Sequence, residues 1–487
     1  MSRRAAAGPA IPIEPTRLAR RLGTLDGALL TIGAVVGTGI FLTAGDVAAA
    51  VRAPALVIGV WIGAGLLTLA GALAYAELGA MLPRAGGLYH FLAEAWGPVW
   101  GFLFGWACFL VIMSGGIAAI SIGFGEYLVG ALPGLELALA PLSRTLRTGA
   151  PQLVAAAGIV VLTAVNHFGV RSGATTQNLF TFAKALALFV LGLAGLAAGG
   201  GAAGLHQVAG VASDSMLAGS ASGSAFAGAA WGGLSVALIA ALWTYDGWYA
   251  LTFSAGELRE PARSLPRGLL IGVAAVVVLY ALVNLAYLRV LPIEQLSGSR
   301  RVAEATAAAL WGASAGRAIA WLVVVSSFGC LAATILYSSR LYGPIAEAGH
   351  LPSAFGAVHP RWRVPVVSLW AQSAWAVALT LSGTYASLYT MVVFVGIGFH
   401  VAAVLGLFRL RITHAALPRP YRAWGYPVLP LMYAIAMLAL AFDTLRATPR
   451  ESTMGLLLTL AGLPAFALWR RFRSGKSHQP PGDVPTV

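Results

Sequence analysis

Long apolar stretches separated by short polar segments run along most of the chain. A helix that crosses a membrane needs roughly 20 predominantly apolar residues. Twelve stretches fit this pattern, at residues 25–50, 54–82, 91–129, 151–169, 179–199, 231–257, 267–291, 317–343, 364–383, 385–408, 426–446 and 453–471. The third stretch is long, and we expect it to tilt or to extend beyond the bilayer. The pattern therefore predicts an all-α polytopic membrane protein with twelve transmembrane helices.

Two of the twelve stretches are interrupted near the middle. The first contains Gly33-Ala-Val-Val-Gly-Thr-Gly-Ile-Phe41, and each glycine costs a helix about 1 kcal/mol relative to alanine. The sixth contains Tyr245-Asp-Gly-Trp248, in which Asp-Gly is a turn signal. Irregular backbone inside a membrane is tolerated where it lines a cavity or is buried in protein. The glycines could instead serve close helix packing, but the second interruption favours two broken helices.

Both interruptions have features that suit a charged ligand. The half-helix that begins near Gly39 would point amide N–H groups and the positive end of its dipole at an anionic group. Asp246 has two possible roles. It could cap the second half-helix of the sixth stretch, which is the role that the sequence favours, or it could face a ligand amine.

The spacing of the interruptions predicts an inverted repeat. The first stretch begins one group of five spans and the sixth begins the next, which turns the second group upside down relative to the first. Interrupted spans in matching positions of two inverted halves indicate a secondary-transporter binding site near the membrane midplane. The predicted organisation is an N-terminal arm at 1–24, a first repeat at 25–199, a Gly/Ala/Ser-rich extracellular loop at 200–230, a second repeat at 231–408, two further helices at 409–471 and a tail at 472–487.

Composition supports a membrane protein, and the distribution of charge sets its orientation. Of the 487 residues, 59% are hydrophobic and 10% are charged, whereas a soluble domain has about 25% charged residues. The net charge is +14. With the N-terminus inside, 21 of the 31 lysines and arginines lie in cytoplasmic segments and 9 in extracellular ones. This asymmetry predicts cytoplasmic termini and arginine contacts with anionic lipid headgroups, and no nucleic-acid partner.

Two ionisable residues inside predicted spans are candidates for special roles. Lys184 is one of only two lysines in the chain, and a charge within the membrane is by default a functional candidate. Because Lys184 lies near the start of its span, it could also snorkel to the interface. Glu77 lies near the cytoplasmic end of the second span, where we expect it to pair with an arginine.

These motifs resemble those of the amino acid–polyamine–organocation superfamily, most closely the bacterial relatives of the L-type amino acid transporters. The resemblance is carried by Gly37-Thr38-Gly39-Ile40-Phe41, Tyr75-Ala-Glu-Leu-Gly79 with Pro83 and Gly86-Gly87, Ala183-Lys184, Tyr245-Asp-Gly-Trp248 with Glu257 and Pro261, and Ser327-Phe-Gly329 with Arg340, and covers roughly residues 22–445. It implies a leucine-transporter-like fold, in which spans 1, 2, 6 and 7 pack against a scaffold of spans 3, 4, 8 and 9. It also implies alternating access and an amino acid substrate.

The resemblance implies a role for individual residues of the two interruptions. Amides around Thr38, Gly39 and Ile40 would bind the substrate carboxylate, and carbonyls of Val35, Trp243 and Thr244 would bind its α-ammonium. Trp243 matches an aromatic gate, and Gly247 would keep the break of the sixth span open. The predicted substrate-binding residues are Val35, Gly37, Thr38, Gly39, Ile40, Trp243, Thr244, Tyr245, Asp246 and Gly247.

The resemblance also suggests how transport is coupled. Sodium-coupled members bind a cation between spans 1 and 8, and sodium-independent members have a lysine of span 5 there instead. Lys184 matches that lysine, with Ser326 and Ser327 as nearby hydroxyl groups on span 8. We therefore expect sodium-independent transport in which Lys184, Ser326 and Ser327 are the coupling residues.

The substrate is less tightly defined by the sequence. Position 246 is Asp here and small in the animal transporters, so their side-chain pocket cannot be transferred. Gly396 and Ile397 in span 10 offer no obvious polar contact, which favours a neutral, apolar amino acid. The alternative is proton-coupled or exchange transport of cationic amino acids or polyamines.

Other classes of membrane protein fit the sequence poorly. Of the eight histidines only His400 lies deep in a span, so a bis-histidine haem is not expected. The chain has no HExxH zinc motif, phosphate loop or serine elbow, and we expect neither enzyme activity nor a cofactor. A channel would not need two inverted broken helices. The sequence thus predicts a multi-pass amino acid transporter of the bacterial cytoplasmic membrane, without an obligatory protein partner.

Overall fold

The computed structural model describes residues 22–83, 86–168, 173–198, 225–347, 349 and 351–474. Most of the predicted N-terminal arm, most of the 200–230 loop and the tail beyond residue 474 lie outside these ranges. The described residues are almost entirely helical. Their one β-type pairing is an isolated parallel bridge between Leu22 and Leu258.

The first half of the chain contains two short helices in place of the first predicted span. Its elements are α1 (Thr24–Val35), α2 (Gly39–Val51), α3 (Pro54–Met81), α4 (Leu88–Trp96), α5 (Pro98–Ala107), the π-helix η1 (Cys108–Ile112), α6 (Met113–Ala131), α7 (Pro133–Leu146), α8 (Ala150–His167) and α9 (Gly173–Ala197). Proline in the first turn begins α3, α5, α7 and α8, where its missing N–H leaves no helix bond unmade.

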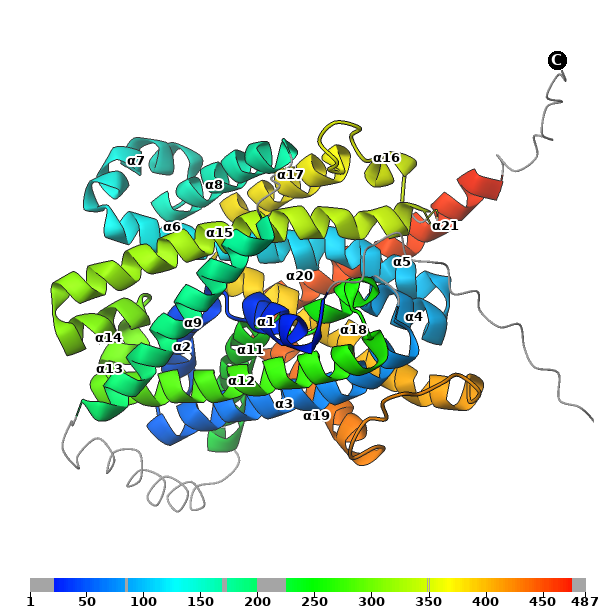
Figure 1. The fold of residues 1–487 in the computed structure, drawn as a ribbon. Coiled ribbons are helices and arrows are strands. Elements are labelled where there is room, and N and C mark those ends of the chain that lie inside the picture. Colours follow the sequence, from blue (N-terminus) through cyan, green and yellow to red (C-terminus); the bar gives the residue numbers. More distant parts are fainter. Residues whose placement is uncertain are drawn as a thin grey trace, which may run out of the picture.

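The second half begins with another interrupted segment. Its elements are α11 (Ala225–Tyr245), the 3-10 helix η2 (Ala250–Glu257), α12 (Pro261–Val290), α13 (Ile293–Gly298), α14 (Val302–Trp311), α15 (Ala313–Glu347), α16 (Ser353–Gly356), α17 (Val366–Ser382), α18 (Tyr385–Thr413), α19 (Val428–Ala447), α20 (Pro449–Leu460) and α21 (Gly462–Ser474). Figure 1 shows the long helices α3, α12 and α15 running across the molecule.

Length and composition identify the helices that can cross a membrane. Among the described residues eight helical segments are long and apolar enough, and the bent pair α1–α2 makes a ninth. Shorter apolar helices lie at Phe182–Ala197 and Val366–Ser382, within the fifth and ninth predicted spans. The structure therefore establishes a polytopic helical membrane protein.

The third predicted span, 91–129, is wrong at its beginning. The chain breaks at Gly97, whose φ is +96°, and Pro98 starts a new helix. A left-handed glycine followed by proline is a strong stop signal. Residues Leu88–Trp96 therefore form the separate helix α4, and the spanning segment runs from Pro98 to Ala131.

The helices fall into two contacting groups. In one group α12 packs against α1 and α3, and α11 packs against α2 and α3. In the other, α6, α8, α15 and α17 pack against one another, while α18 contacts helices of both groups. These are the groups that the resemblance implies, with α9 lying against α1, α12 and α15.

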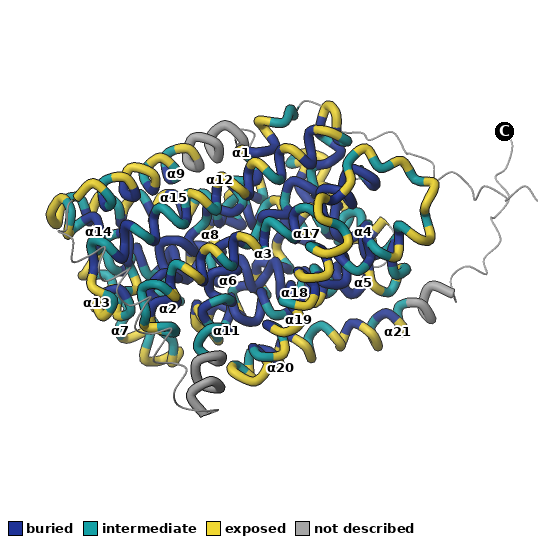
Figure 2. The backbone as a smooth tube through the Cα atoms, turned by 90° about the horizontal axis from the view of Figure 1, so that it is seen from below, coloured by how far each residue is buried: buried dark blue, intermediate teal, exposed yellow. Residues whose placement is uncertain are grey.

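The buried core lies between these groups, and the apolar exterior faces outward. Figure 2 shows buried backbone through the interior and exposed backbone along the outer helices. Outward side chains such as Leu66, Val278 and Met432 are exposed and apolar. Such a surface is what a helix in contact with lipid tails requires.

Candidate functional site

The site begins with the two breaks that the sequence predicts, and the structure contains both. Helix α1 ends at Val35 and α2 begins at Gly39, and their axes differ by 52°. Helix α11 ends at Tyr245, and a turn of four residues precedes η2. Each break leaves backbone amides and carbonyls of helix ends without partners in their own helix.

The structure corrects the predicted role of Asp246 as a helix cap. The segment after the turn is a 3-10 helix that begins at Ala250, with Tyr249 in the capping position. The Asp246 carboxylate instead accepts hydrogen bonds from the Gly247 amide and the Tyr249 hydroxyl. Gly247 has φ +90°, which turns the chain before a new α-helix can start. Asp246 therefore stabilises the turn itself.

The two breaks are in direct contact through glycine. A Cβ on Gly39 would lie 2.8 Å from Thr244 Oγ1, and a Cβ on Gly247 would lie 2.8 Å from the Ala34 carbonyl oxygen. The hydroxyls of Thr43 and Thr244 are 2.6 Å apart. Gly39 thus allows α2 and α11 to pack closely, as the alternative explanation of the glycines proposed. It also forms part of the first turn of α2.

Gly37 differs from Gly39 because space is open beside it. The nearest atom to a Cβ at Gly37 would be the Val35 carbonyl oxygen at 3.9 Å, and Gly37 itself is only half-buried. The amides of the first turn of α2 follow at Gly39 and Ile40. An anionic group placed next to Gly37 would therefore meet the positive end of α2.

The carbonyl ends of α1 and α11 meet at the same place. Val35 is the last residue of α1, and its carbonyl accepts from the Gly37 amide at 2.7 Å. The Trp243 carbonyl accepts from the Asp246 amide at 3.1 Å. The Val35 and Thr244 carbonyls also face the hydroxyl of Tyr280 on α12, at 3.1 and 3.2 Å. Nothing in the sequence distinguishes Tyr280, because a tyrosine in an apolar helix looks like any core aromatic.

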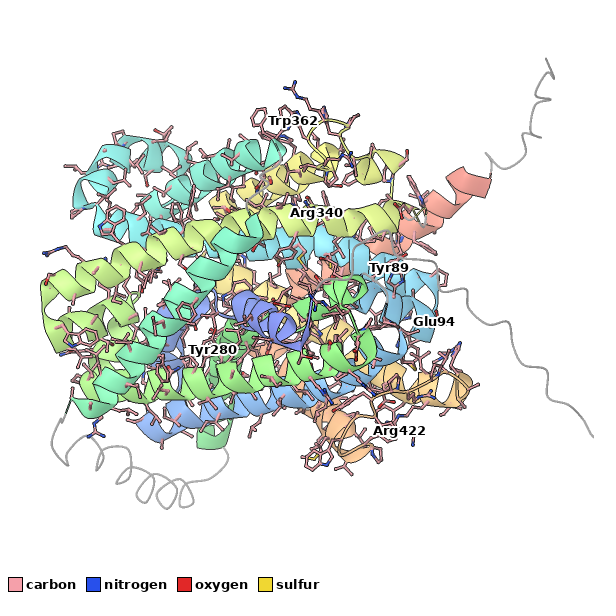
Figure 3. The ribbon with its side chains drawn as sticks, viewed as in Figure 1. Tyr89, Glu94, Tyr280, Arg340, Trp362 and Arg422 are labelled. Carbon is pink, nitrogen blue, oxygen red and sulfur yellow. The ribbon has the colours of Figure 1, made fainter. Side chains whose placement is uncertain are left out.

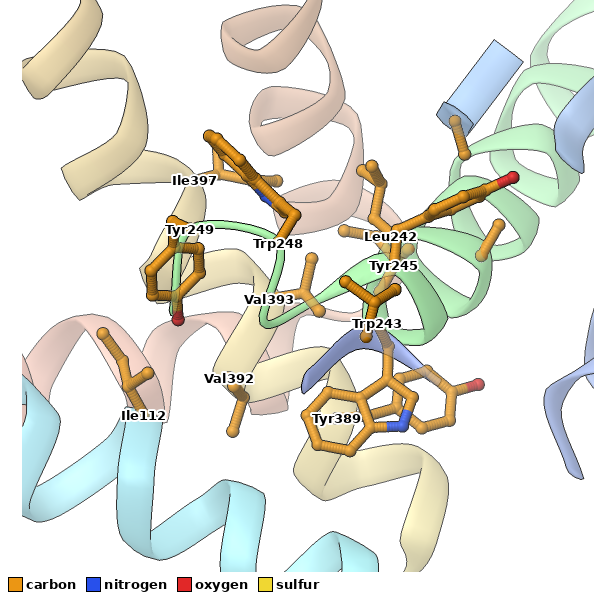
Figure 4. Close-up of a cluster of buried hydrophobic side chains, with 14 of the residues drawn as sticks. Ile112, Leu242, Trp243, Tyr245, Trp248, Tyr249, Tyr389, Val392, Val393 and Ile397 are labelled. Carbon is orange, nitrogen blue, oxygen red and sulfur yellow. The ribbon is translucent and has the colours of Figure 1, made fainter. Parts of the chain in front are cut away.

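Trp243 and Tyr245 point to opposite sides of α11 (Figure 4). The Trp243 indole N–H donates to the Tyr385 hydroxyl at 2.9 Å, and its ring is stacked on Tyr389. Tyr245 donates to the Trp61 carbonyl of α3 at 3.1 Å. Trp243 therefore lies between α11 and α18 as a gate would, whereas the Tyr245 side chain packs against α3.

A cavity lies beside the α11 break. It holds about 40 Å³ and is lined by Asp246, Trp248 and Tyr249, by Gly396, Ile397 and His400 of α18, and by apolar side chains of neighbouring helices. His400 Nδ1 is 2.7 Å from the Tyr75 hydroxyl. His400 follows Gly396 by four residues, the helical spacing that puts both on one face, and this signal could have placed it in the site.

Lys184 is buried inside the protein, where only 3% of it is exposed. Its helix α9 contacts both α1 and α15, and Cys330 lies on α15. Ser326 and Ser327 are buried about one turn before Cys330 on the same helix. This burial between helices does not fit a lysine that snorkels to the interface.

The predicted pairing of Glu77 with an arginine is confirmed. The Glu77 carboxylate is fully buried and accepts two hydrogen bonds from Arg411, at 2.9 and 2.6 Å. It also accepts from the Ala423 amide at 2.7 Å. This ion pair joins the end of α3 to the end of α18 and to the loop that follows it.

A polytopic helical protein whose two discontinuous helices meet in its interior has the architecture of a secondary transporter. The sequence profile of the amino acid permease family matches residues 22–461. The chain belongs to this family.

Curated relatives cover nearly the whole chain. It is 29% identical over 456 residues to the serine/threonine exchanger SteT of Bacillus subtilis (strain 168), covering 93% of this chain and 97% of the relative. It is 29% identical to the b(0,+)-type amino acid transporter 1 of Mus musculus, covering 95% of this chain and 90% of the relative. It is 27% identical to the cystine/glutamate transporter of Homo sapiens, covering 94% of this chain and 86% of the relative.

Proposed function

We propose that the protein is a secondary active transporter that moves amino acids across the cytoplasmic membrane by alternating access. The observation that carries the proposal is the meeting of helix ends of opposite polarity at Gly37. The N-terminus of α2 suits a carboxylate, and the C-termini of α1 and α11 suit an ammonium. An amino acid backbone carries both groups a short distance apart. The names of the relatives, an exchanger among them, support the same substrate class.

We propose neutral L-amino acids as the substrates. The cavity beside Trp248 is lined mainly by apolar and aromatic side chains. Its one carboxylate, Asp246, already accepts from Gly247 and Tyr249, so it does not require a cationic partner. At about 40 Å³ the cavity is a few times the ~10–15 Å³ that one buried water needs. Small side chains fit best, and larger ones require the walls to move.

A second candidate is a cationic amino acid or polyamine, and Asp246 is the observation that favours it. A carboxylate beside the rings of Trp248 and Tyr249 would attract a cation both by charge and by the aromatic faces. A cationic substrate would have to displace the Tyr249 hydroxyl from this carboxylate. Competition separates the two candidates, because neutral and cationic amino acids would rank in opposite orders.

Further features of the proposal concern topology and coupling. We propose twelve spans with cytoplasmic termini, of which the first ten form two inverted groups of five. The pairing of the broken segments α1–α2 and α11–η2 supports this arrangement. Buried Lys184 between α1 and α15 supports sodium-independent transport.

The test is uptake by proteoliposomes of radiolabelled alanine in competition with each of the twenty amino acids. We expect small neutral amino acids to compete, and arginine and lysine to compete weakly. Strong competition by arginine and lysine alone would establish the second candidate. An absence of uptake or binding for all twenty would refute the proposed function.

A further inference from the structure

A buried histidine presents one ring nitrogen to the cavity beside the α11 break. Figure 3 shows side chains filling the spaces between the helices, so an open space next to a polar atom is a distinctive feature. His400 of α18 lines this cavity together with Gly396, about one turn before it. A Cβ on Gly396 would lie 3.9 Å from His400 Nε2. The missing side chain of Gly396 therefore keeps Nε2 open to the cavity.

The other nitrogen of His400 contacts Tyr75, and this contact decides which nitrogen carries the proton. The Tyr75 side chain is fully buried on α3. Within the described part of the chain His400 Nδ1, at 2.7 Å, is the one hydrogen-bond partner of its hydroxyl. A buried O–H that donates to nothing is costly, and a neutral imidazole has one acceptor and one donor nitrogen. The arrangement that pairs the hydroxyl proton has Tyr75 donating to Nδ1, which puts the N–H of His400 on Nε2.

This Nε2 N–H has no acceptor among the described residues. The rings of Trp248 and Tyr249 lie beside the imidazole, at 5.5 and 4.8 Å between centroids. Apolar side chains such as Val393 and Ile397 form much of the remaining wall (Figure 4). A ligand that excludes water from an N–H without replacing the hydrogen bond loses affinity. The cavity therefore favours a ligand group that accepts a hydrogen bond.

The same cavity also contains acceptors. Asp246 and Thr68 line it. The Asp246 carboxylate has lone pairs beyond those used by its own turn, and the Thr68 hydroxyl spends its proton on the Ala64 carbonyl at 2.8 Å. A ligand group that both accepts and donates is thus satisfied here. An alcohol is the smallest side-chain group of this kind, and it suits a cavity of about 40 Å³ better than an amide does.

We propose that His400, positioned by Tyr75, makes the carrier select small amino acids with a hydroxyl side chain. The Nε2 N–H donates to the hydroxyl oxygen, and the hydroxyl donates its proton to the Asp246 carboxylate. Tyr75 does not touch the substrate and acts through Nδ1 of the imidazole. This inference rests on the proposed function of amino acid transport, and it narrows the neutral substrates to serine and threonine.

The first test needs no variant, because it compares ligands of equal shape. L-serine and L-α-aminobutyrate differ only by a hydroxyl in place of a methyl group, and so do L-threonine and L-valine. Each is tested for inhibition of labelled alanine uptake by proteoliposomes. We expect the hydroxyl amino acid of each pair to bind about tenfold more tightly, the equivalent of one hydrogen bond. Equal affinities within the pairs, or tighter binding of the apolar members, would overturn the proposal.

Variants of His400 connect this preference to the ring nitrogen. His400→Phe keeps a ring and removes the N–H, so the ratio of the serine and α-aminobutyrate affinities should fall to near one. His400→Gln offers an amide N–H close to the position of Nε2 and should retain part of the ratio. A loss of structure would weaken the binding of both ligands and leave their ratio unchanged. A parent ratio in His400→Phe would therefore overturn the proposal.

Tyr75→Phe tests the positioning role. Without the hydroxyl the imidazole proton is free to move to Nδ1, so the same ratio should fall several-fold. The control is Tyr342→Phe, which removes a buried hydroxyl that has no hydrogen-bond partner among the described residues and should keep the parent ratio. A parent ratio in Tyr75→Phe would overturn the role of Tyr75.

The two proposals fail in distinguishable ways. A parent protein that transports alanine without preferring serine to α-aminobutyrate would refute this inference and leave the proposed function standing. A parent protein that binds none of the amino acids would refute both.

Discussion

A side chain at Gly37 would enter open space, whereas a side chain at Gly39 would meet Thr244 at 2.8 Å. The two glycines therefore have different structural roles, which experiments can distinguish although the sequence alone does not. Gly39 and Gly247 let the two breaks approach each other. Gly37 leaves room beside the Val35 carbonyl and the first turn of α2.

We predict that Gly37→Ala folds normally but loses substrate affinity by tenfold or more, roughly the loss of one to two charge-assisted hydrogen bonds. The added methyl would occupy the space that the substrate backbone needs. Binding measurements and a thermal unfolding curve on the same protein provide the check. A variant that binds as tightly as the parent would show that the substrate backbone lies elsewhere.

For Gly39→Val we predict loss of transport together with lower thermal stability. The larger side chain would collide with the backbone of Thr244, whose Cα lies 3.0 Å from the position of the new Cβ. Membrane insertion should survive, because the apolar character of the span is kept. Near-normal uptake by this variant would contradict the assigned contact between α2 and α11.

Trp243 provides a further test at the scale of one side chain. Trp243→Ala removes the ring stacked on Tyr389 and the hydrogen bond to Tyr385, so we predict a strongly raised KM or a strongly reduced turnover. Trp106→Ala is the control, because Trp106 donates to the Leu458 carbonyl at 2.9 Å, away from the breaks. Equal effects of both substitutions on KM would reduce Trp243 to a packing residue.

At the scale of helices, local signals in the sequence predict the breaks, and long-range packing decides the rest. Glycines and an Asp-Gly pair inside apolar stretches are sufficient to place both interruptions. The 3-10 form of η2 could not be predicted, because it depends on hydrogen bonds within the Asp246–Tyr249 turn. The separate helix α4 could have been predicted from Gly97-Pro98. The position of Tyr280 could not have been predicted, because only the fold brings its hydroxyl to the carbonyls of Val35 and Thr244.

The ion pair of Glu77 joins three elements and should contribute to stability. Glu77→Gln weakens both hydrogen bonds from Arg411 and leaves its charge poorly compensated. Breaking a buried pair typically costs about 3–5 kcal/mol, so we predict a clear fall in the midpoint of thermal unfolding in detergent. Glu260→Gln is the control, since its pair with Arg263 is exposed. Similar midpoints for the two variants would contradict a structural role for Glu77.

At the scale of the whole molecule, the helix of Lys184, α9, contacts α1 of one helix group and α15 of the other. The burial of Lys184 on this helix leads us to predict transport that does not require sodium. Lys184→Ala should impair uptake at every sodium concentration. Lys184→Arg should not restore uptake, because the bulkier guanidinium group of arginine cannot replace the compact ammonium group of lysine. Uptake that rises steeply with sodium, or an active Lys184→Ala variant, would contradict this role.

The central claim is that the meeting point of the two broken helices binds and carries an amino acid. Counterflow in sodium-free liposomes tests it most directly, with the parent and Gly37→Ala compared at equal amounts of folded protein. The claim predicts that liposomes loaded with unlabelled amino acid transiently accumulate the labelled one through the parent, and that Gly37→Ala strongly reduces this accumulation when the labelled amino acid is below the KM of the parent. Equal counterflow through both proteins, or none through the parent with any of the twenty amino acids, would contradict it.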